Sequence, residues 1–534
     1  MARWHKPLAC GHAGSQAKAA KPYATQITNQ NMNDQKRYEK LCDHFRETAL
    51  LKSTSALLEW DQQTGLPSQA DDYRCQQMTF LAGEIHRRNT DPQIGELLDA
   101  LKDSTLSSDP ESDTAAVICN LKREYDRDVR VPAELVKELA SATSRGHNVW
   151  VKARKENDYA TFAPTLARII ELSQQKADAI GFEDCRYDAL LDEYEPGAKT
   201  SEVAEVLAGL RDELVPLIEQ IKGSKNQPSN ELLHRNYPVE TQKAFAKEAS
   251  AAIGFDYDRG RLDETHHPFC TEIGPDDCRI LTRYDESFFS AGFFGTLHEA
   301  GHGMYEQGLR GDQYGLPTGR YCSLGIHESQ SRLWENLVGR SRAFWQHFFP
   351  SAQKYFSLAL GDQSVDDFYS AINTVQPSMI RVEADEATYN LHIIIRFELE
   401  HDLIDGTLSV DDLPEAWNSK YESLLRIKPQ SYAEGVLQDV HWSAGLFGYF
   451  PTYSLGNLYA SQFFASADAE IGDLAEQFAN GQFQPLKSWL NTNVHQHGQK
   501  YSSPELGKRI IEQSLSHDAL MADLRSRLFP VYGL

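Results

Sequence analysis

The sequence predicts a mainly α-helical fold, arranged in two lobes around a deep groove, with one small β-sheet near the candidate active site. Apolar residues recur at helical spacing over residues 34–252 and again through most of the chain after residue 284. Only residues 260–284 alternate as strands do, around a Gly274-Pro275 turn. No apolar run reaches the roughly 18 residues that a membrane span requires.

The helical part begins with two clear stripes. Tyr38, Leu41 and Phe45 start the first, at i, i+3 and i+7. The second runs from Val203 to Ile221 and is stopped by Gly223, a residue that favours helix ends. Residues 103–113 and 223–230 are expected to be loops.

The sheet region precedes the most informative part of the chain. Cys278, Ile280 and Thr282 alternate along one expected strand, and His267 is expected in a hairpin. Helical patterns follow at residues 290–305, from His327 onward, at residues 379–395 and at residues 504–529. A glycine-rich loop over residues 311–325 separates the first two.

The expected domain organisation is a tail followed by one domain. Residues 1–33 contain no acidic residue and are expected to form a disordered or basic N-terminal tail. Residues 34–534 are expected to form a single helical domain. Its parts would be an N-terminal helical part (34–257), a metal- and substrate-site part (258–460) and C-terminal helices (461–534).

Composition excludes several classes of partner. The chain has 53 basic and 77 acidic residues, a net charge of −24, so neither nucleic acid nor an anionic membrane is an expected partner. Its eight cysteines are scattered without a C-x-x-C pair, which indicates free thiols and a cytoplasmic location. Cys270 and Cys278 bracket a short turn and would pair only if oxidised. Cys322 is a possible competitor for metal.

The strongest motif is His298-Glu299-Ala300-Gly301-His302, which reads H-E-x-x-H. On a helix this spacing puts both histidines on one face, where they can bind one metal ion. Both lie on the apolar stripe, and a buried imidazole without partners costs about 1–3 kcal/mol. Two ligands explain the pair better than two independent core histidines. Glu299 would then be the general base that activates water.

The third metal ligand should be an acidic residue downstream of the motif. Glu328 opens the next helical pattern, and a helix antiparallel to the first would return it to the histidines. Glu335, two turns further, is the second choice. Glu306 is one turn beyond His302, where tetrahedral geometry would be strained, and Asp312 lies in the glycine-rich loop. Glu328 could also be a helix N-terminal acid stabilised by the helix dipole.

Six separated motifs, in order, carry a family resemblance that runs from about residue 35 to the C-terminus. They are His267-Pro268-Phe269 (H-P-F), Asp277-Cys278-Arg279-Ile280-Leu281 (D-x-R-x-T, with leucine in place of threonine), residues 298–302 (H-E-x-x-H), His327-Glu328-Ser329-Gln330 (H-E-S-Q), Ile380-Arg381-Val382-Glu383-Ala384-Asp385 (I-R-x-x-A-D) and residues 435–442 (G-x-x-Q-D-x-H-W). The chain resembles the Taq-type thermostable metallocarboxypeptidases. Thr282 follows Leu281 directly, so a shift of one residue would restore the missing hydroxyl.

The resemblance implies a metal site made by His298, His302 and Glu328, with Glu299 as general base. The expected cofactor is one divalent metal, zinc, with cobalt as the alternative. The expected activity is release of single residues from the free C-terminus of peptides. Members of this family are mostly helical, hold the substrate in a long groove and are commonly homodimers.

A carboxypeptidase must also hold the substrate's terminal carboxylate, and arginine binds a carboxylate through two hydrogen bonds. Arg381 is the first candidate and Arg279 the second. The alternative for Arg381 is a structural ion pair with Asp385, one turn away. His267, Tyr449 and Tyr453 are candidate donors to the oxyanion. His441, from the last motif, completes the candidate substrate-binding residues with Arg381, Arg279, Tyr449 and Tyr453.

Two other functions remain open from the residues. The first is a metallo-endopeptidase, oligopeptidase or aminopeptidase on a similar helical scaffold. The second is a non-catalytic helical binding protein with a relic metal site, although a relic has no reason to keep Glu299 between its ligands.

Overall fold

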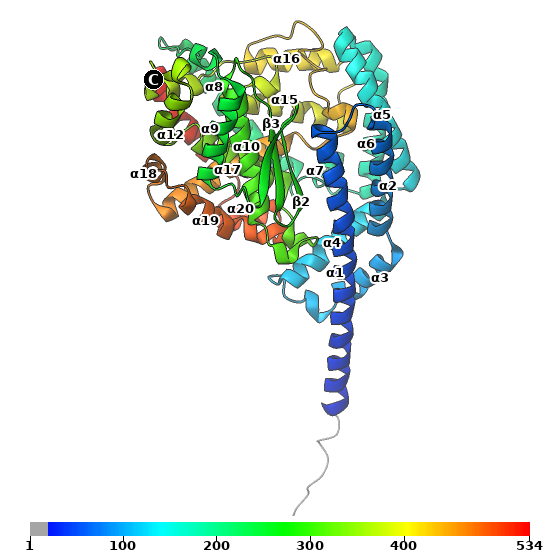
Figure 1. Ribbon diagram of the computed structural model, residues 1–534. Helices are drawn as coiled ribbons and strands as arrows, with labels where there is room; N and C mark the ends of the chain where they lie inside the picture. Colours follow the sequence, from blue (N-terminus) through cyan, green and yellow to red (C-terminus); the bar gives the residue numbers. More distant parts are fainter. Residues whose placement is uncertain (1–19) are drawn as a thin grey trace, which may run out of the picture.

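The computed structural model describes the backbone of residues 20–534 and the side chains of residues 31–534 (Figure 1). The helices before the sheet are α1 (Ala20–Thr64), α2 (Asp71–Asn89), α3 (Pro92–Lys102), α4 (Asp113–Arg130), α5 (Ala133–Glu156), α6 (Tyr159–Ile180), α7 (Arg186–Leu191), α8 (Thr200–Gly223) and α9 (Val239–Ile253). The strands are β1 (Gly260–Glu264), β2 (Phe269–Gly274) and β3 (Asp277–Thr282).

The chain is helical again after the sheet. These helices are α10 (Phe289–Gly308), α11 (Leu324–Arg332), α12 (Arg342–Tyr355), α13 (Ser357–Leu360), α14 (Val365–Ile372), α15 (Glu386–Asp405), α16 (Leu413–Leu425), α17 (Pro451–Ile471), α18 (Leu474–Ala479), α19 (Gln484–Asn493), α20 (Ser503–Ile511) and α21 (Asp518–Tyr532). A π-helical segment, η5 (Leu333–Val338), directly continues α11. The predicted mainly helical fold with a small sheet is confirmed.

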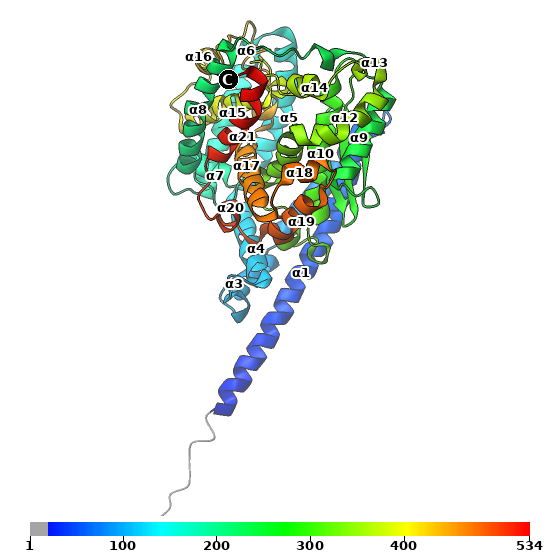
Figure 2. The same cartoon turned by 90° about the vertical axis from the view of Figure 1, so that its left-hand side faces the viewer.

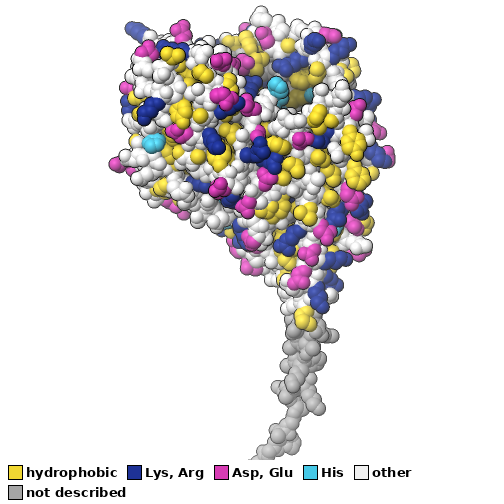
Figure 3. Space-filling model, viewed as in Figure 1, with side chains coloured by type: hydrophobic (Ala, Val, Ile, Leu, Met, Phe, Trp, Pro, Cys, Tyr) yellow, Lys and Arg dark blue, Asp and Glu magenta, His cyan; other side chains and the backbone are white. Residues whose placement is uncertain are grey.

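The N-terminal part of α1 projects from the body of the molecule, and the C-terminus lies at the opposite end (Figures 1 and 2). Of the expected tail of residues 1–33, residues 1–19 lie outside the described residues, and residues 20–33 belong to α1. The space-filling view shows that one face is hollowed in its upper part, where a histidine side chain is visible (Figure 3). No helix within residues 20–534 is long and apolar enough to cross a bilayer.

The sheet has the strand order β1-β3-β2. β3 pairs with β1 in parallel and with β2 in antiparallel orientation, and the β2–β3 turn lies at Gly274-Pro275 as predicted. His267 lies in the β1–β2 connection, so the expected hairpin position is wrong: β1 and β2 both pair with β3 and not with each other. β3 packs on α10, with the Gly303 position against Ile280, and this contact brings the sheet to the candidate site.

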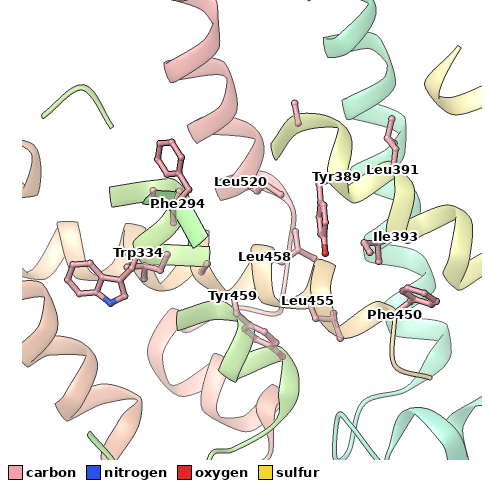
Figure 4. Close-up of a cluster of buried hydrophobic side chains, with 14 of the residues drawn as sticks. Phe294, Trp334, Tyr389, Leu391, Ile393, Phe450, Leu455, Leu458, Tyr459 and Leu520 are labelled. Carbon is pink, nitrogen blue, oxygen red and sulfur yellow. The ribbon is translucent and has the colours of Figure 1, made fainter. Parts of the chain in front are cut away.

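Within residues 31–534, most buried hydrophobic side chains belong to two clusters. A small one joins α1, α3 and α4, around Leu41, Leu98 and Leu121. The large one joins the sheet and the helices from α5 to α21, and Leu455 and Leu458 of α17 lie inside it (Figure 4). The two clusters place the N-terminal helices in a packing unit of their own, beside the core that carries the site.

Glycines let three helices approach one another at the site. A Cβ atom on Gly301 of α10 would lie 2.5 Å from the backbone oxygen of Gln330 in α11. A Cβ atom on Gly456 of α17 would lie 2.6 Å from the Cβ of Glu328. Both distances are shorter than a carbon side chain tolerates, so only glycine permits this packing. α10 and α17 therefore hold α11, and Glu328 with it, from two sides.

The predicted helix over residues 379–395 begins later than expected. Arg381 lies in a short 3-10 turn, and α15 starts only at Glu386. Asp385 is the N-cap of α15, and its side chain accepts the backbone N–H of Thr388 at 3.1 Å. An N-cap residue has extended backbone dihedrals, so the capping aspartate separates Arg381 from the helix.

We expect Gly301→Ala to destabilise the protein by about 1–3 kcal/mol, the usual cost of overpacking a core. The new methyl group would meet the Gln330 backbone, which cannot rotate away. Urea unfolding measures the change in free energy. Gly83→Ala in α2 is the matched control because its Cβ would meet nothing within 4 Å, and it should gain up to about 1 kcal/mol. Equal stability of the Gly301→Ala and wild-type proteins would contradict this packing.

Candidate active site

α10 carries the H-E-x-x-H motif on the side that faces α11. His298 and His302 are one helical turn apart, and 19% and 12% of their side chains are exposed. Glu299 is 5% exposed, and its Oε2 is buried without a hydrogen-bond partner among the described residues. Burial raises the pKa of Glu299 to about 7. The motif thus forms one edge of a nearly closed site.

Glu328 comes to the two histidines from α11. Its Oε2 lies 3.7 Å from His298 Nε2 and 3.5 Å from His302 Nε2. Its Oε1 accepts a hydrogen bond of 2.7 Å from Arg332 Nε, one turn along the same helix. Burial alone would raise the pKa of Glu328, but Arg332 and the histidines hold it well below its usual range. The carboxylate is therefore ionised and aimed at the histidines.

Glu335, the second choice for third ligand, lies behind His298 instead of beside Glu328. His298 Nδ1 is 2.9 Å from Glu335 Oε2. Glu335 also pairs with Arg332 at 3.2 Å and Arg340 at 3.6 Å. Burial lowers the pKa of His298, but the carboxylates of Glu328 and Glu335 outweigh it and raise that pKa overall. Glu335 thus orients the His298 ring from the side away from Glu328.

The other two acidic alternatives lie outside this cluster. Glu306 Oε1 and His327 Nε2 form a hydrogen bond of 2.8 Å. The His327 ring stacks on the His302 ring, with the two ring centres 4.3 Å apart. Asp312 pairs with Arg310 at 3.2 Å on the surface. Only Glu328 brings an oxygen close to both histidines.

A divalent metal fits between these three side chains. One ligand atom of each of His298, His302 and Glu328 lies within 4.8 Å of the others. Tetrahedral zinc with bonds of about 2.0–2.2 Å keeps its ligand atoms roughly 3.3–3.6 Å apart. The separations of 3.5 and 3.7 Å are close to this value. The role of the three residues as ligands stays a prediction.

Arg381 is buried and is already paired. Its Nε and Nη2 donate to Asp439 Oδ1 at 3.0 and 2.9 Å, while Asp439 Oδ2 accepts from Arg396 at 2.6 Å. Burial would raise the pKa of Asp439, but the two arginines hold it well below its usual range. The alternative of an Arg381–Asp385 ion pair is wrong, because Asp385 caps α15 and the guanidinium faces Asp439.

Tyr389, for which sequence reasoning predicted no role, links Arg381 to the ligand cluster. Arg381 Nη1 donates to the Tyr389 hydroxyl at 3.2 Å, and Arg332 lies 4.4 Å over the same ring. Arg332 in turn binds Glu328. The i, i+4 spacing of Glu328 and Arg332 was a signal for their pair. Tyr389 had no such signal, since it lies far along the chain from Arg332.

The aromatic candidates line this region. The Tyr453 hydroxyl is 3.5 Å from His441 Nε2, and the Tyr449 and Tyr453 rings meet edge to face at 5.5 Å. Burial raises the pKa of both tyrosines, so their hydroxyls remain protonated donors. Burial lowers the pKa of His441 to about 4, which leaves that ring neutral. These neutral hydroxyl and imidazole groups can donate hydrogen bonds to a carbonyl or to a carboxylate.

Arg279 and His267 lie apart from this group. Arg279 donates to Asp277 and stacks on Trp60 of α1 at 4.2 Å. His267 is exposed in the β1–β2 connection. In residues 31–534, no hydrogen bond, ion pair or ring contact joins either side chain to the three candidate ligands.

A buried carboxylate fixes the start of α11. Glu195 is 1% exposed; it accepts the Gly325 backbone N–H through Oε1 and the Ser503 hydroxyl through Oε2 at 3.0 Å. Burial raises its pKa to about 7. Glu195 therefore positions the helix that carries Glu328 without touching Glu328 itself.

A helix-borne pair of histidines, a glutamate between them and a second-helix glutamate define the centre of a metallopeptidase. The chain belongs to the carboxypeptidase Taq (M32) metallopeptidase family, which matches residues 40–528. It is thus a metallocarboxypeptidase, a peptide hydrolase that depends on a divalent metal.

Individual relatives agree with this assignment. The chain is 47% identical to thermostable carboxypeptidase 1 of Thermus thermophilus, over 94% of this chain and 100% of the relative. It is 37% identical to carboxypeptidase 1 of Bacillus subtilis, over 93% and 99%. The crystal structure of the M32 carboxypeptidase from Deinococcus radiodurans superposes with a TM-score of 0.90, at 39% identity, over 93% and 100% of the two chains.

We expect Glu195 to make stability fall as pH rises. An unfolded glutamate titrates near its ordinary pKa, whereas the folded pKa is about 7, so between these values only the folded state holds the proton. The free energy of unfolding should therefore drop across this range, by roughly 3 kcal/mol for this group, and then level off. Thermal unfolding from pH 4.5 to 8 measures it.

Glu195→Gln is the comparison because it removes this titration. The difference in unfolding free energy, wild type minus variant, should decrease across the same pH range. A difference that stays constant with pH would show that folding does not raise the pKa of Glu195.

Proposed function

We propose that this enzyme releases single residues from the free C-terminus of peptides, using one metal held by His298, His302 and Glu328 and using Glu299 as general base. The observation that carries the proposal is the convergence of three ligand atoms beside a buried carboxylate. The names of the relatives, all carboxypeptidases, support the direction of cleavage. No feature favours an endopeptidase or a relic site.

Two histidines and one glutamate are a donor set of catalytic zinc sites, so we propose zinc, with cobalt as the alternative. A bound divalent cation supplies Lewis-acid chemistry, which lowers the pKa of coordinated water towards about 7 and polarises a carbonyl. Glu335 supports the site by holding the ring of His298 through Nδ1, which leaves Nε2 free to bind. Arg332 keeps both carboxylates ionised and in place.

Glu299 is suited to move protons near neutral pH. Its pKa of about 7 lies where a general base works best, because the group is ionised often enough and still basic enough. Its free Oε2 can take a proton from water and pass it to the leaving amine.

We assign the terminal carboxylate of the substrate to the Arg381 region. Nε and Nη2 of Arg381 are engaged by Asp439, so the Nη1 edge, beside Tyr389, is the part that can meet a ligand. His441, Tyr449 and Tyr453 lie on the same side and are proposed as further donors to the substrate. Arg279 and His267 keep their proposed roles only if substrate binding draws the sheet closer.

We also propose a domain organisation, an oligomeric state, a location and a class of partner for this protein. Residues 34–534 are proposed to be a single domain with the parts 34–257, 258–460 and 461–534. A homodimer, a cytoplasmic location and partners limited to peptides fit the family resemblance and the net charge of −24.

Metal-loaded enzyme should shorten an unblocked peptide from its C-terminus, one residue at a time. Mass spectrometry should show that ladder, and an amidated C-terminus should stop it. Glu299→Gln should retain metal and lose about 10²–10⁴-fold in kcat, the usual contribution of general acid–base catalysis. Rapid internal cleavage of the amidated peptide would indicate an endopeptidase. Full activity of Glu299→Gln would contradict the role of Glu299.

Glu335→Gln should weaken metal binding by about 10–100-fold, the usual effect of losing an outer-shell partner of a histidine ligand. Competition with a chromophoric chelator measures this affinity without an activity assay. Glu383→Gln, an exposed glutamate in the turn after Arg381, is the control and should bind metal as the wild type does. Unchanged affinity of Glu335→Gln would remove Glu335 from the metal site.

A further inference from the structure

Two thiols of the sheet lie in contact beside α10, and the proposed peptidase mechanism uses neither. Cys270 of β2 and Cys278 of β3 have their Sγ atoms 3.6 Å apart. Cys278 is 3% exposed and Cys270 is half-buried, so the pair is reached from the Cys270 side. Both are free cysteines.

The register of β2 and β3 keeps the backbones of Cys270 and Cys278 apart, although their sulfur atoms are in contact. Cys270 is opposite Ile280, and Cys278 is opposite Glu272, so the cysteines are diagonal neighbours on one face of the sheet. Diagonal Cα atoms are about 7–8 Å apart, whereas a disulfide usually spans 4.4–6.8 Å. A direct S–S bond would therefore require the strands to shift.

One atom between the sulfurs fits without such a shift. Two thiolates on one tetrahedral zinc ion, with metal–sulfur bonds of about 2.3 Å, are about 3.8 Å apart, and a larger soft cation holds them slightly further apart. The Sγ atoms of Cys270 and Cys278, at 3.6 Å, are already close to that separation. Soft cations prefer thiolate ligands over other side chains.

The surroundings are acidic, which favours a cation. The neighbouring Cys278 thiol and burial raise the pKa of Cys270 well above its usual range, and Glu306 and Glu299 raise it further. Burial and the nearby Glu306 raise the pKa of Glu272 to about 8. Among the described residues, no lysine or arginine forms an ion pair with these three glutamates. An arriving cation would supply the missing positive charge.

We propose that Cys270 and Cys278 form a second metal site, a dithiolate site for one soft divalent cation such as Cd²⁺. Binding forms two metal–sulfur bonds and releases the two thiol protons to solvent, with no change of oxidation state. This binding does not depend on the proposed role of Glu299.

The thiol pair lies on the strand face that packs on α10. Ile280, between Cys278 and Thr282 on the same strand face, contacts the Gly303 position of α10, one residue beyond His302. A cation held by the two thiols would therefore lie beside the helix that carries the candidate histidine ligands, without using either histidine.

The test titrates Cd²⁺ into full-length enzyme whose catalytic site is already loaded with zinc. The ultraviolet thiolate-to-cadmium charge-transfer band should saturate at one added equivalent. Cys270→Ser and Cys278→Ser should each weaken Cd²⁺ binding by more than the roughly 10–100-fold that an outer-shell loss costs. Cys75→Ser and Cys119→Ser, which alter exposed cysteines, should leave the band unchanged.

Two results would overturn the proposal: no band at one equivalent, or a band that persists in both strand variants. Release of zinc into a chelator identifies exchange of Cd²⁺ into the catalytic site. Cys270→Ala and Cys278→Ala should also lose the band. Their melting temperatures show whether each variant is folded, so that loss of the band through unfolding can be recognised. Glu299→Gln should keep the band, so failure of the proposed catalytic role is distinguishable from failure of this site.

Discussion

The site depends on the contact between α10 and α11, which is close because position 301 has no side chain. The Gly301 backbone faces the Gln330 carbonyl, and from the other side Gly456 of α17 faces Glu328. These two contacts fix the distance between a helix that carries two histidines and a helix that carries one carboxylate. A shift of about 1 Å between reacting groups can cost roughly 10²-fold in rate, so this constraint matters for catalysis as well as for stability.

Buried ion pairs fix the side chains of the site after the glycines have fixed the distance between its helices. Glu328 and Glu335 share Arg332, and Arg340 adds a second cation to Glu335. Taking such charges out of water is costly, and breaking a buried pair by removing one partner typically costs 3–5 kcal/mol. The network therefore stabilises the fold only when all of its charged side chains are present. Its direct benefit is to the metal site, because Glu328 stays ionised and His298 keeps one orientation.

The sequence could predict the local parts of this arrangement. Helical periodicity and the H-E-x-x-H spacing identify α10, and the Gly274-Pro275 turn identifies the β2–β3 hairpin, because both signals lie within a few residues. The partner of Arg381 could not be predicted in the same way. Asp439 is 58 residues away, and the nearer Asp385 is used as a helix cap. Spacing also left Glu328 and Glu335 as alternatives, since both lie on one helical face and only packing separates them.

Crystals of the zinc-loaded enzyme, measured at the zinc absorption edge, would test the central claim most directly. The account predicts an anomalous peak between α10 and α11, within about 2.0–2.2 Å of His298 Nε2, His302 Nε2 and Glu328 Oε2, with Glu335 bound to His298 Nδ1 and not to the metal. A peak coordinated by Glu335 or Glu306 in place of Glu328, or no peak between α10 and α11, would contradict it.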